Sequence, residues 1–277
     1  MKYLVNMLLV AALFTACTGT ENEMNGMADD GSSVMGEEIS YTADTLTMNG
    51  YIAYDNSTSE KRPGILVVHE WWGHDEYARH RADMLAELGY VALAVDMYGN
   101  GKQAAHPEDA MAFSGNVMSN FENAKARFNA ALETLKANPN VDTEKIGAIG
   151  YCFGGSVILS MANAGLDLDG VAAFHAGLQL PQMPAEGMTS RILILNGAED
   201  QFVTDEQVEN LTGALESINA DYQYINYEGV MHSFTNPGAD SLGAKFQLPL
   251  AYDAEADSLS WEEMKSFFDQ TFADKSM

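Results

Sequence analysis

A cysteine flanked by glycines is the part of this chain best suited to covalent chemistry. It lies in Gly150-Tyr151-Cys152-Phe153-Gly154-Gly155, after a strand-like apolar run and before a helix-like one. This is the G-x-nucleophile-x-G pattern of a nucleophile elbow, with cysteine in place of the usual serine. At the helix N-terminus, unpaired N–H groups and the helix dipole favour a thiolate. We predict that Cys152 is a nucleophile; the alternative is a buried cysteine in an ordinary glycine-rich turn.

A cysteine nucleophile needs a base and an acid that orients the base, each in a loop after a strand. Asp200 directly follows a buried apolar run, and His232 follows the last predicted strand. The chain order nucleophile, acid, histidine is that of the α/β-hydrolase fold. Glu199 and Asp205 remain alternative acids, and His175, which follows another predicted strand, is a weaker candidate base.

The other four histidines are not expected to act as the catalytic base. His69 is expected to shape the pocket, whereas His74, His80 and His106 are expected on the surface or at helix ends. No group of histidines has the spacing of metal ligands, so we predict neither a metal nor another cofactor.

These residues define a reaction. His232 would take the proton of Cys152 or stabilise its thiolate, while Asp200 holds the imidazole tautomer. The thiolate would attack an ester or lactone carbonyl. The backbone N–H groups of Phe153 and of Trp71, in the turn after an earlier buried strand, are the expected oxyanion donors.

Strand-like and helix-like segments alternate along the chain and would position these loops. The predicted strands are 39–41, 46–54, 65–68, 91–95, 146–149, 171–174, 192–195 and 222–227. The predicted helices are 75–88, 107–118, 121–137, 153–164, 208–218 and a final one that begins at Ser260, where Ser260 and Glu263 form a capping box. Alternation of this kind predicts an α/β protein of α/β-hydrolase fold, with a mostly parallel central sheet and helices on both faces.

Several motifs together resemble those of the dienelactone hydrolase family, over roughly residues 38–273. They are Val67-Val68-His69-Glu70-Trp71-Trp72-Gly73, Asp96-Met97-Tyr98-Gly99, the segment 147–155, Gly197-Ala198-Glu199-Asp200, His232-Ser233-Phe234, and Ala251-Tyr252-Asp253-Ala254 before the helix with Trp261. The resemblance implies a triad of Cys152, Asp200 and His232. It also implies that Glu70 lies close to the nucleophile and helps to generate the thiolate when substrate binds. From the residues alone, Glu70 is a carboxylate in an apolar turn, which is costly unless paired or functional; the alternative is a strand-end residue that faces solvent.

Two positions depart from the family pattern. Its well-studied members hold a substrate carboxylate with two arginines, at positions where this chain has Asn100 and Asn236. Asparagine can hydrogen-bond an acid but brings no charge, and Lys102 is a candidate substitute. We predict that Asn100 and Asn236 bind substrate and expect a neutral ester or lactone.

The N-terminus has the features of an export signal. A basic start, an apolar stretch and small residues before a cysteine indicate a lipoprotein-type signal peptide over 1–16, with Cys17 as the lipidated residue. Residues 17–37 are polar without an apolar face, so a disordered tether is expected there, followed by a single domain over 38–277. The protein is then exported to the cell envelope, periplasmic or outer-membrane, and contacts the membrane only through its anchor. With Cys17 modified, Cys152 would be the only free thiol of the mature protein.

The formal net charge is −26. Such acidity disfavours nucleic acid and anionic lipid, and slows anionic substrates by repulsion. The expected partner is a small ester or lactone; the sequence does not define the oligomeric state. Two alternatives remain open: true dienelactone hydrolase activity, and a non-catalytic ligand-binding lipoprotein of the same fold.

Overall fold

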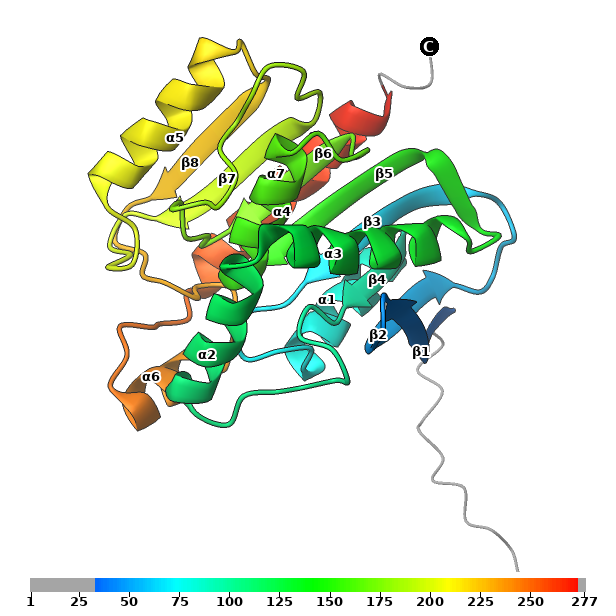
Figure 1. The fold of residues 1–277 in the computed structure, drawn as a ribbon, viewed down its shortest axis with the longest axis horizontal. Coiled ribbons are helices and arrows are strands. Elements are labelled where there is room, and N and C mark those ends of the chain that lie inside the picture. The colour runs from blue at the N-terminus through cyan, green and yellow to red at the C-terminus, as the bar shows by residue number, and fades with distance from the viewer. Residues whose placement is uncertain (1–32, 274–277) are drawn as a thin grey trace, which may run out of the picture. The chain divides into compact units, whose positions relative to one another are not determined.

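An eight-stranded sheet, in the order β1-β2-β4-β3-β5-β6-β7-β8, forms the centre of the domain (Figure 1). The computed structural model describes residues 33–273. Its strands are β1 (Val34–Ala43), β2 (Leu46–Asp55), β3 (Arg62–Val68), β4 (Val91–Val95), β5 (Val141–Tyr151), β6 (Gly170–Phe174), β7 (Arg191–Gly197) and β8 (Tyr222–Tyr227). Its helices are α1 (Glu76–Glu87), α2 (Pro107–Met118), α3 (Phe121–Lys136), α4 (Phe153–Asn163), α5 (Asp205–Ser217), α6 (Ala239–Phe246) and α7 (Ala254–Ala273).

The sheet is antiparallel at one edge and parallel elsewhere. β1 pairs with β2 and β2 with β4 in antiparallel register, whereas all pairs from β4 through β3 to β8 are parallel. Every residue of β4 and β6 is buried, because helices cover both faces of a parallel sheet. The predicted α/β class and mostly parallel sheet are therefore confirmed.

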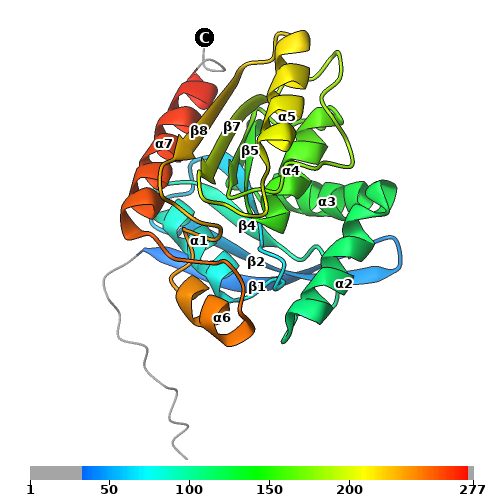
Figure 2. The same cartoon turned by 90° about the vertical axis from the view of Figure 1, so that its left-hand side faces the viewer.

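Two helical layers enclose the sheet (Figure 2). α1 and α7 cover one face, and α3, α4 and α5 cover the other. Each layer has its own apolar core, one containing Leu85 and Phe268 and the other containing Phe128 and Leu215. Because consecutive parallel strands end at the same edge of the sheet, the loops after β3, β5, β7 and β8 come together there.

Several elements begin earlier than expected from the sequence, among them β3 at Arg62, β5 at Val141 and α5 at Asp205. β1 begins at Val34, within the segment predicted as tether, because its backbone pairs with β2 while most of its side chains stay exposed, as on an edge strand. The final helix begins at Ala254 rather than at Ser260, because the Asp253 carboxylate accepts a hydrogen bond from the N–H of Ala256. Ser260 is buried inside this helix, so the predicted capping box is wrong. Helix α6 was not predicted.

The predicted signal peptide over 1–16, the lipidation residue Cys17 and most of the predicted tether lie outside the described residues. Within 33–273, no helix is long and apolar enough to cross a bilayer.

Candidate active site

The elbow that carries Cys152 is a sharp turn between β5 and α4. Cys152 has φ 53° and ψ −115°, in the left-handed region that side chains rarely adopt. A Cβ on Gly150 would lie 2.3 Å from the carbonyl oxygen of Gly154, and one on Gly154 would lie 2.2 Å from the carbonyl oxygen of Val68. Both glycines are therefore required for the chain to turn here, and the turn presents Cys152 at the N-terminus of α4.

His232 and Asp200 lie together at the same edge of the sheet, although 32 residues separate them. His232 Nδ1 is 2.7 Å from Asp200 Oδ2, and both residues are buried. The other Asp200 oxygen accepts a hydrogen bond from the N–H of Phe202, which fixes the carboxylate. Glu199 and Asp205, the alternative acids, are exposed.

The charge state of His232 depends on its two acidic neighbours. Burial alone would lower the pKa of His232, but charge and hydrogen-bond interactions with Cys152 and Asp200 outweigh it and raise the pKa from 6.5 to about 10. The structure therefore favours the imidazolium form of His232.

A rigid turn after β3 orients the N–H of Trp71. The carbonyl of Glu70 accepts hydrogen bonds from His69 Nδ1 and from the N–H of Gly73. Because a trans peptide places C=O and N–H on opposite sides, the N–H of Trp71 points away from these donors. The Tyr98 hydroxyl donates to the carbonyl of Trp71 at 2.8 Å and holds the next peptide.

Phe153 is the expected second oxyanion donor. It is the first residue of α4, so its N–H has no acceptor within the helix. The Phe153 ring stacks on the His69 ring, with centroids 5.6 Å apart, and this contact joins the two predicted donor segments.

His69 shapes this part of the site as a neutral ring. Its Nε2 accepts a hydrogen bond from the N–H of Met97, so Nδ1 carries the proton that is donated to Glu70. Burial lowers the pKa of His69 to about 4. His74, expected on the surface or at a helix end, directly precedes the N-cap Asp75 of α1 but is buried, and burial lowers its pKa to about 3.

Glu70 is held within the site by two side chains of the histidine loop, the segment 228–238 between β8 and α6 that carries His232. The Ser233 hydroxyl donates to Glu70 Oε1 at 2.8 Å, and the Asn236 side-chain amide donates to Oε2. Burial raises the pKa of the Glu70 carboxyl, although these hydrogen bonds lower it in part. Glu70 is 2 % exposed, so it does not face solvent. The side-chain amide of Asn236, which was predicted to bind substrate, is hydrogen-bonded to Glu70 instead.

A buried polar network connects the histidine loop to α1, α7 and the loop after β6. Thr235 Oγ1 contacts His175 Nε2 at 2.8 Å and the Tyr77 hydroxyl at 2.7 Å. Arg81 donates to the Thr235 carbonyl and, at 2.6 Å, to the Asp257 carboxylate of α7. His175, the alternative base, thus contributes to this network, with its ring 5.2 Å from that of His232.

Sequence reasoning missed this network. A signal was present, because Arg81 lies three residues after Ala78 and four before Leu85 on the buried face of α1, where a charge requires a partner.

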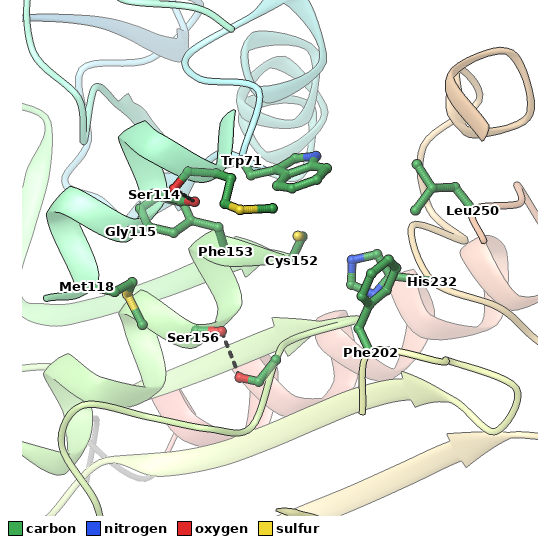
Figure 3. A pocket seen from close by; sticks show the side chains of 12 residues that line it. Trp71, Ser114, Gly115, Met118, Cys152, Phe153, Ser156, Phe202, His232 and Leu250 are labelled. Atoms are coloured by element: carbon green, nitrogen blue, oxygen red, sulfur yellow. Dashed lines mark hydrogen bonds between the residues drawn. The ribbon is translucent and has the colours of Figure 1, made fainter. Parts of the chain in front are cut away.

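A cavity of about 320 Å³ opens above Cys152 (Figure 3). It is lined by Trp71, Met111, Ser114, Gly115, Met118, Cys152, Phe153, Ser156, Gly177, Phe202, His232 and Leu250. None of these residues of the described chain is an arginine or a lysine. The lining is thus mostly apolar, with the thiol and the imidazole as its reactive groups.

Asn100 and Lys102 are not among the residues that line this cavity. Asn100 is exposed. The Lys102 ammonium lies 5.8 Å from the centre of the Phe113 ring, and Lys102 lines a different hollow. Within residues 33–273, no three His, Cys, Asp or Glu side chains form a group that could hold a metal ion.

The sheet, the strained elbow, and the acid and histidine after later strands together define an α/β hydrolase. Comparison with known proteins specifies the family. The model of the dienelactone hydrolase family matches residues 48–272.

Two solved structures align closely with the domain. The structure called m3DLH has 36% sequence identity and a TM-score of 0.82, and the alignment covers 86% of this chain and 99% of that one. P91, a dienelactone hydrolase-like promiscuous phosphotriesterase from metagenomic libraries, has 32% identity and a TM-score of 0.79, with the same coverage. Protein usf of Aquifex pyrophilus is 29% identical over 207 residues, which cover 73% of this chain and 88% of the relative.

The chain belongs to the dienelactone hydrolase family. It is a dienelactone hydrolase-like enzyme that acts on ester bonds, and the resemblance expected from the sequence motifs is confirmed.

Proposed function

We propose that this protein hydrolyses neutral carboxylic esters or lactones through a thioester formed on Cys152. The observation that carries the proposal is the position of Cys152, on a strained elbow beneath an apolar cavity and beside the buried His232–Asp200 pair. An inert structural cysteine would need neither the strained backbone nor a charged histidine next to it.

The reaction follows from these positions. The Cys152 thiolate forms a C–S bond with the substrate carbonyl carbon, and the negative charge that develops on the carbonyl oxygen is stabilised by the N–H groups of Phe153 and Trp71. When the C–O bond breaks, the His232 imidazolium gives its proton to the leaving alkoxide. His232, now neutral, takes a proton from water as the water oxygen attacks the thioester carbonyl carbon. The C–S bond then breaks, which releases the carboxylic acid and restores the Cys152 thiolate beside the His232 imidazolium. Asp200 keeps the imidazole oriented throughout.

Three features favour a neutral substrate over an anionic dienelactone. No arginine or lysine lines the described cavity, and the amide of Asn236 is bound to Glu70. The net charge of −26 repels anions at long range. True dienelactone hydrolase activity is the alternative within the family.

The test measures hydrolysis of p-nitrophenyl acetate by the wild-type chain and by Cys152→Ala and His232→Ala. We expect activity in the wild type and its loss in both variants, and a much lower kcat/KM for an anionic dienelactone than for neutral esters. Faster turnover of the dienelactone would favour the alternative. A folded wild-type protein without activity, and with a slowly alkylating Cys152, would instead support a ligand-binding protein.

We also propose that the chain is exported and lipid-anchored through Cys17, because the first 17 residues have the pattern of a lipoprotein signal. Labelling of expressing bacteria with radioactive palmitate tests this. Label on the wild type but not on Cys17→Ser supports the anchor, whereas a cytosolic protein that retains Met1 contradicts it.

A further inference from the structure

The cavity extends to both sides of Cys152, and the two sides differ. Figure 3 shows Ser114, Gly115 and Met118 of α2 on one side of Cys152, and His232, Phe202 and Leu250 on the other. The α2 side also includes Met111. The four α2 residues have the spacing of one helical face, so this face of α2 forms a wall of the cavity.

The chemistry assigns a substrate part to each side. His232 must protonate the leaving alkoxide, so the alcohol part of the ester lies on the His232 side. The carbonyl oxygen lies toward the N–H groups of Phe153 and Trp71. The acyl chain, which remains on Cys152 after the alcohol leaves, is then directed toward α2.

The α2 side is suited to hydrocarbon. The hydroxyl of Ser114 donates to the carbonyl of Ala110, and that of Ser156 donates to the carbonyl of Gly177, each at 2.7 Å. Both hydroxyl protons are thus used within the protein. The methionines Met111 and Met118 add flexible apolar surface that can adapt to a chain.

Gly115 keeps this side open. It lies inside α2, where glycine is less favourable than alanine by roughly 0.5–1 kcal/mol. A Cβ at Gly115 would meet no atom within 4 Å, so packing does not require glycine at this position. Its effect is to leave space along the cavity wall.

We propose that Gly115 determines acyl-chain specificity and that the α2 face, Met111, Ser114, Gly115 and Met118, binds an unbranched saturated acyl chain. This inference rests on the proposed ester hydrolysis through Cys152. It adds the substrate class: esters of short to medium fatty acids, in preference to acetate or to hydroxylated and charged acids.

The test compares kcat/KM for p-nitrophenyl acetate, butanoate and hexanoate in the wild type, Gly115→Leu and Gly115→Val. Gly213→Leu is the matched control, because Gly213 is also an exposed glycine inside a helix, its Cβ would meet nothing within 4 Å, and it does not line the cavity. Circular dichroism checks that each variant is folded, and Cys152→Ala measures the activity that does not depend on the thiol.

In the wild type we expect kcat/KM to rise by about fourfold for each methylene that becomes buried. Gly115→Leu should lower the hexanoate-to-acetate ratio of kcat/KM at least about tenfold, and Gly115→Val should act in the same direction. Gly213→Leu should keep the wild-type profile.

An active, Cys152-dependent enzyme whose chain-length profile is the same in Gly115→Leu and Gly213→Leu would overturn the assignment of α2. An equal loss on all three esters in Gly115→Leu would overturn it as well, because the substitution would then block access rather than select the chain. Absence of Cys152-dependent activity from the wild type would refute the proposed function itself, which is a distinguishable result.

Discussion

Removal of the Cys152 thiol should lower the pKa of the histidine beside it. The rise in the pKa of His232 from 6.5 to about 10 corresponds to about 5 kcal/mol in favour of the imidazolium. Burial acts in the opposite direction, so Cys152 and Asp200 together supply more than this net amount. In Cys152→Ala, Asp200 still accepts the Nδ1 hydrogen bond, and we expect the pKa of His232 to fall by more than about one unit.

The assay is a pH titration of the histidine ring carbon signals by NMR. His232→Asn identifies the His232 signal among those of the six histidines. Asp200→Asn should also lower the midpoint. With Cys152→Ala and Asp200→Asn combined, burial acts without the two acidic partners, so the pKa of His232 should fall below its ordinary value.

Two results of the His232 titration would contradict these expected pKa shifts. An unchanged midpoint in Cys152→Ala would show that the thiol does not stabilise the imidazolium. A wild-type midpoint near the ordinary histidine value would remove the charged pair from the proposed mechanism altogether.

Other substitutions test the surrounding structure. Glu70→Gln should lower kcat/KM by about a hundredfold with folding retained; an unchanged kcat/KM would exclude a role in catalysis. Gly154→Ala should prevent folding, because its Cβ would lie 2.2 Å from a backbone oxygen; a thermal melt like that of the wild type would contradict this. Gly115→Ala, with free space around it, should instead stabilise the fold by about 0.5–1 kcal/mol in urea unfolding. Arg81→Met leaves the Asp257 carboxylate without its cation and should destabilise the protein by about 3–5 kcal/mol; a loss below about 1 kcal/mol would show that the ion pair is dispensable.

Features with strong local signals could be predicted from the sequence. Cys152, Asp200 and His232 each follow a strand-like run in the sequence, so the rule that parallel strands end at one edge was sufficient to place them together. The bounds of α2 and β8 coincide with those predicted, because Pro107 begins the helix and the strand is a compact run of β-favouring residues.

Features that depend on distant contacts could not be predicted. The partners of Glu70 lie more than 160 residues away, with sequence separations of 163 and 166, and no local pattern indicates that Asn236 would be used there. His74 lies at the start of α1, one of the positions expected for it, but the packing around the turn after β3 buries it. The start of α7 depends on the cap supplied by Asp253. Ser260 and Glu263 match the sequence pattern of a capping box, so the sequence predicted a later start.

The contact between Arg81 and the last helix has a consequence for how the enzyme matures. Arg81 joins the loop that carries His232 to Asp257, and Asp257 lies in α7, which follows all eight strands along the described chain. Whether the chain emerges from the ribosome or from an export channel, the sheet and the elbow are available for folding before this helix is. The histidine loop then still lacks its support. We therefore expect the proposed catalytic site to be completed only when α7 docks.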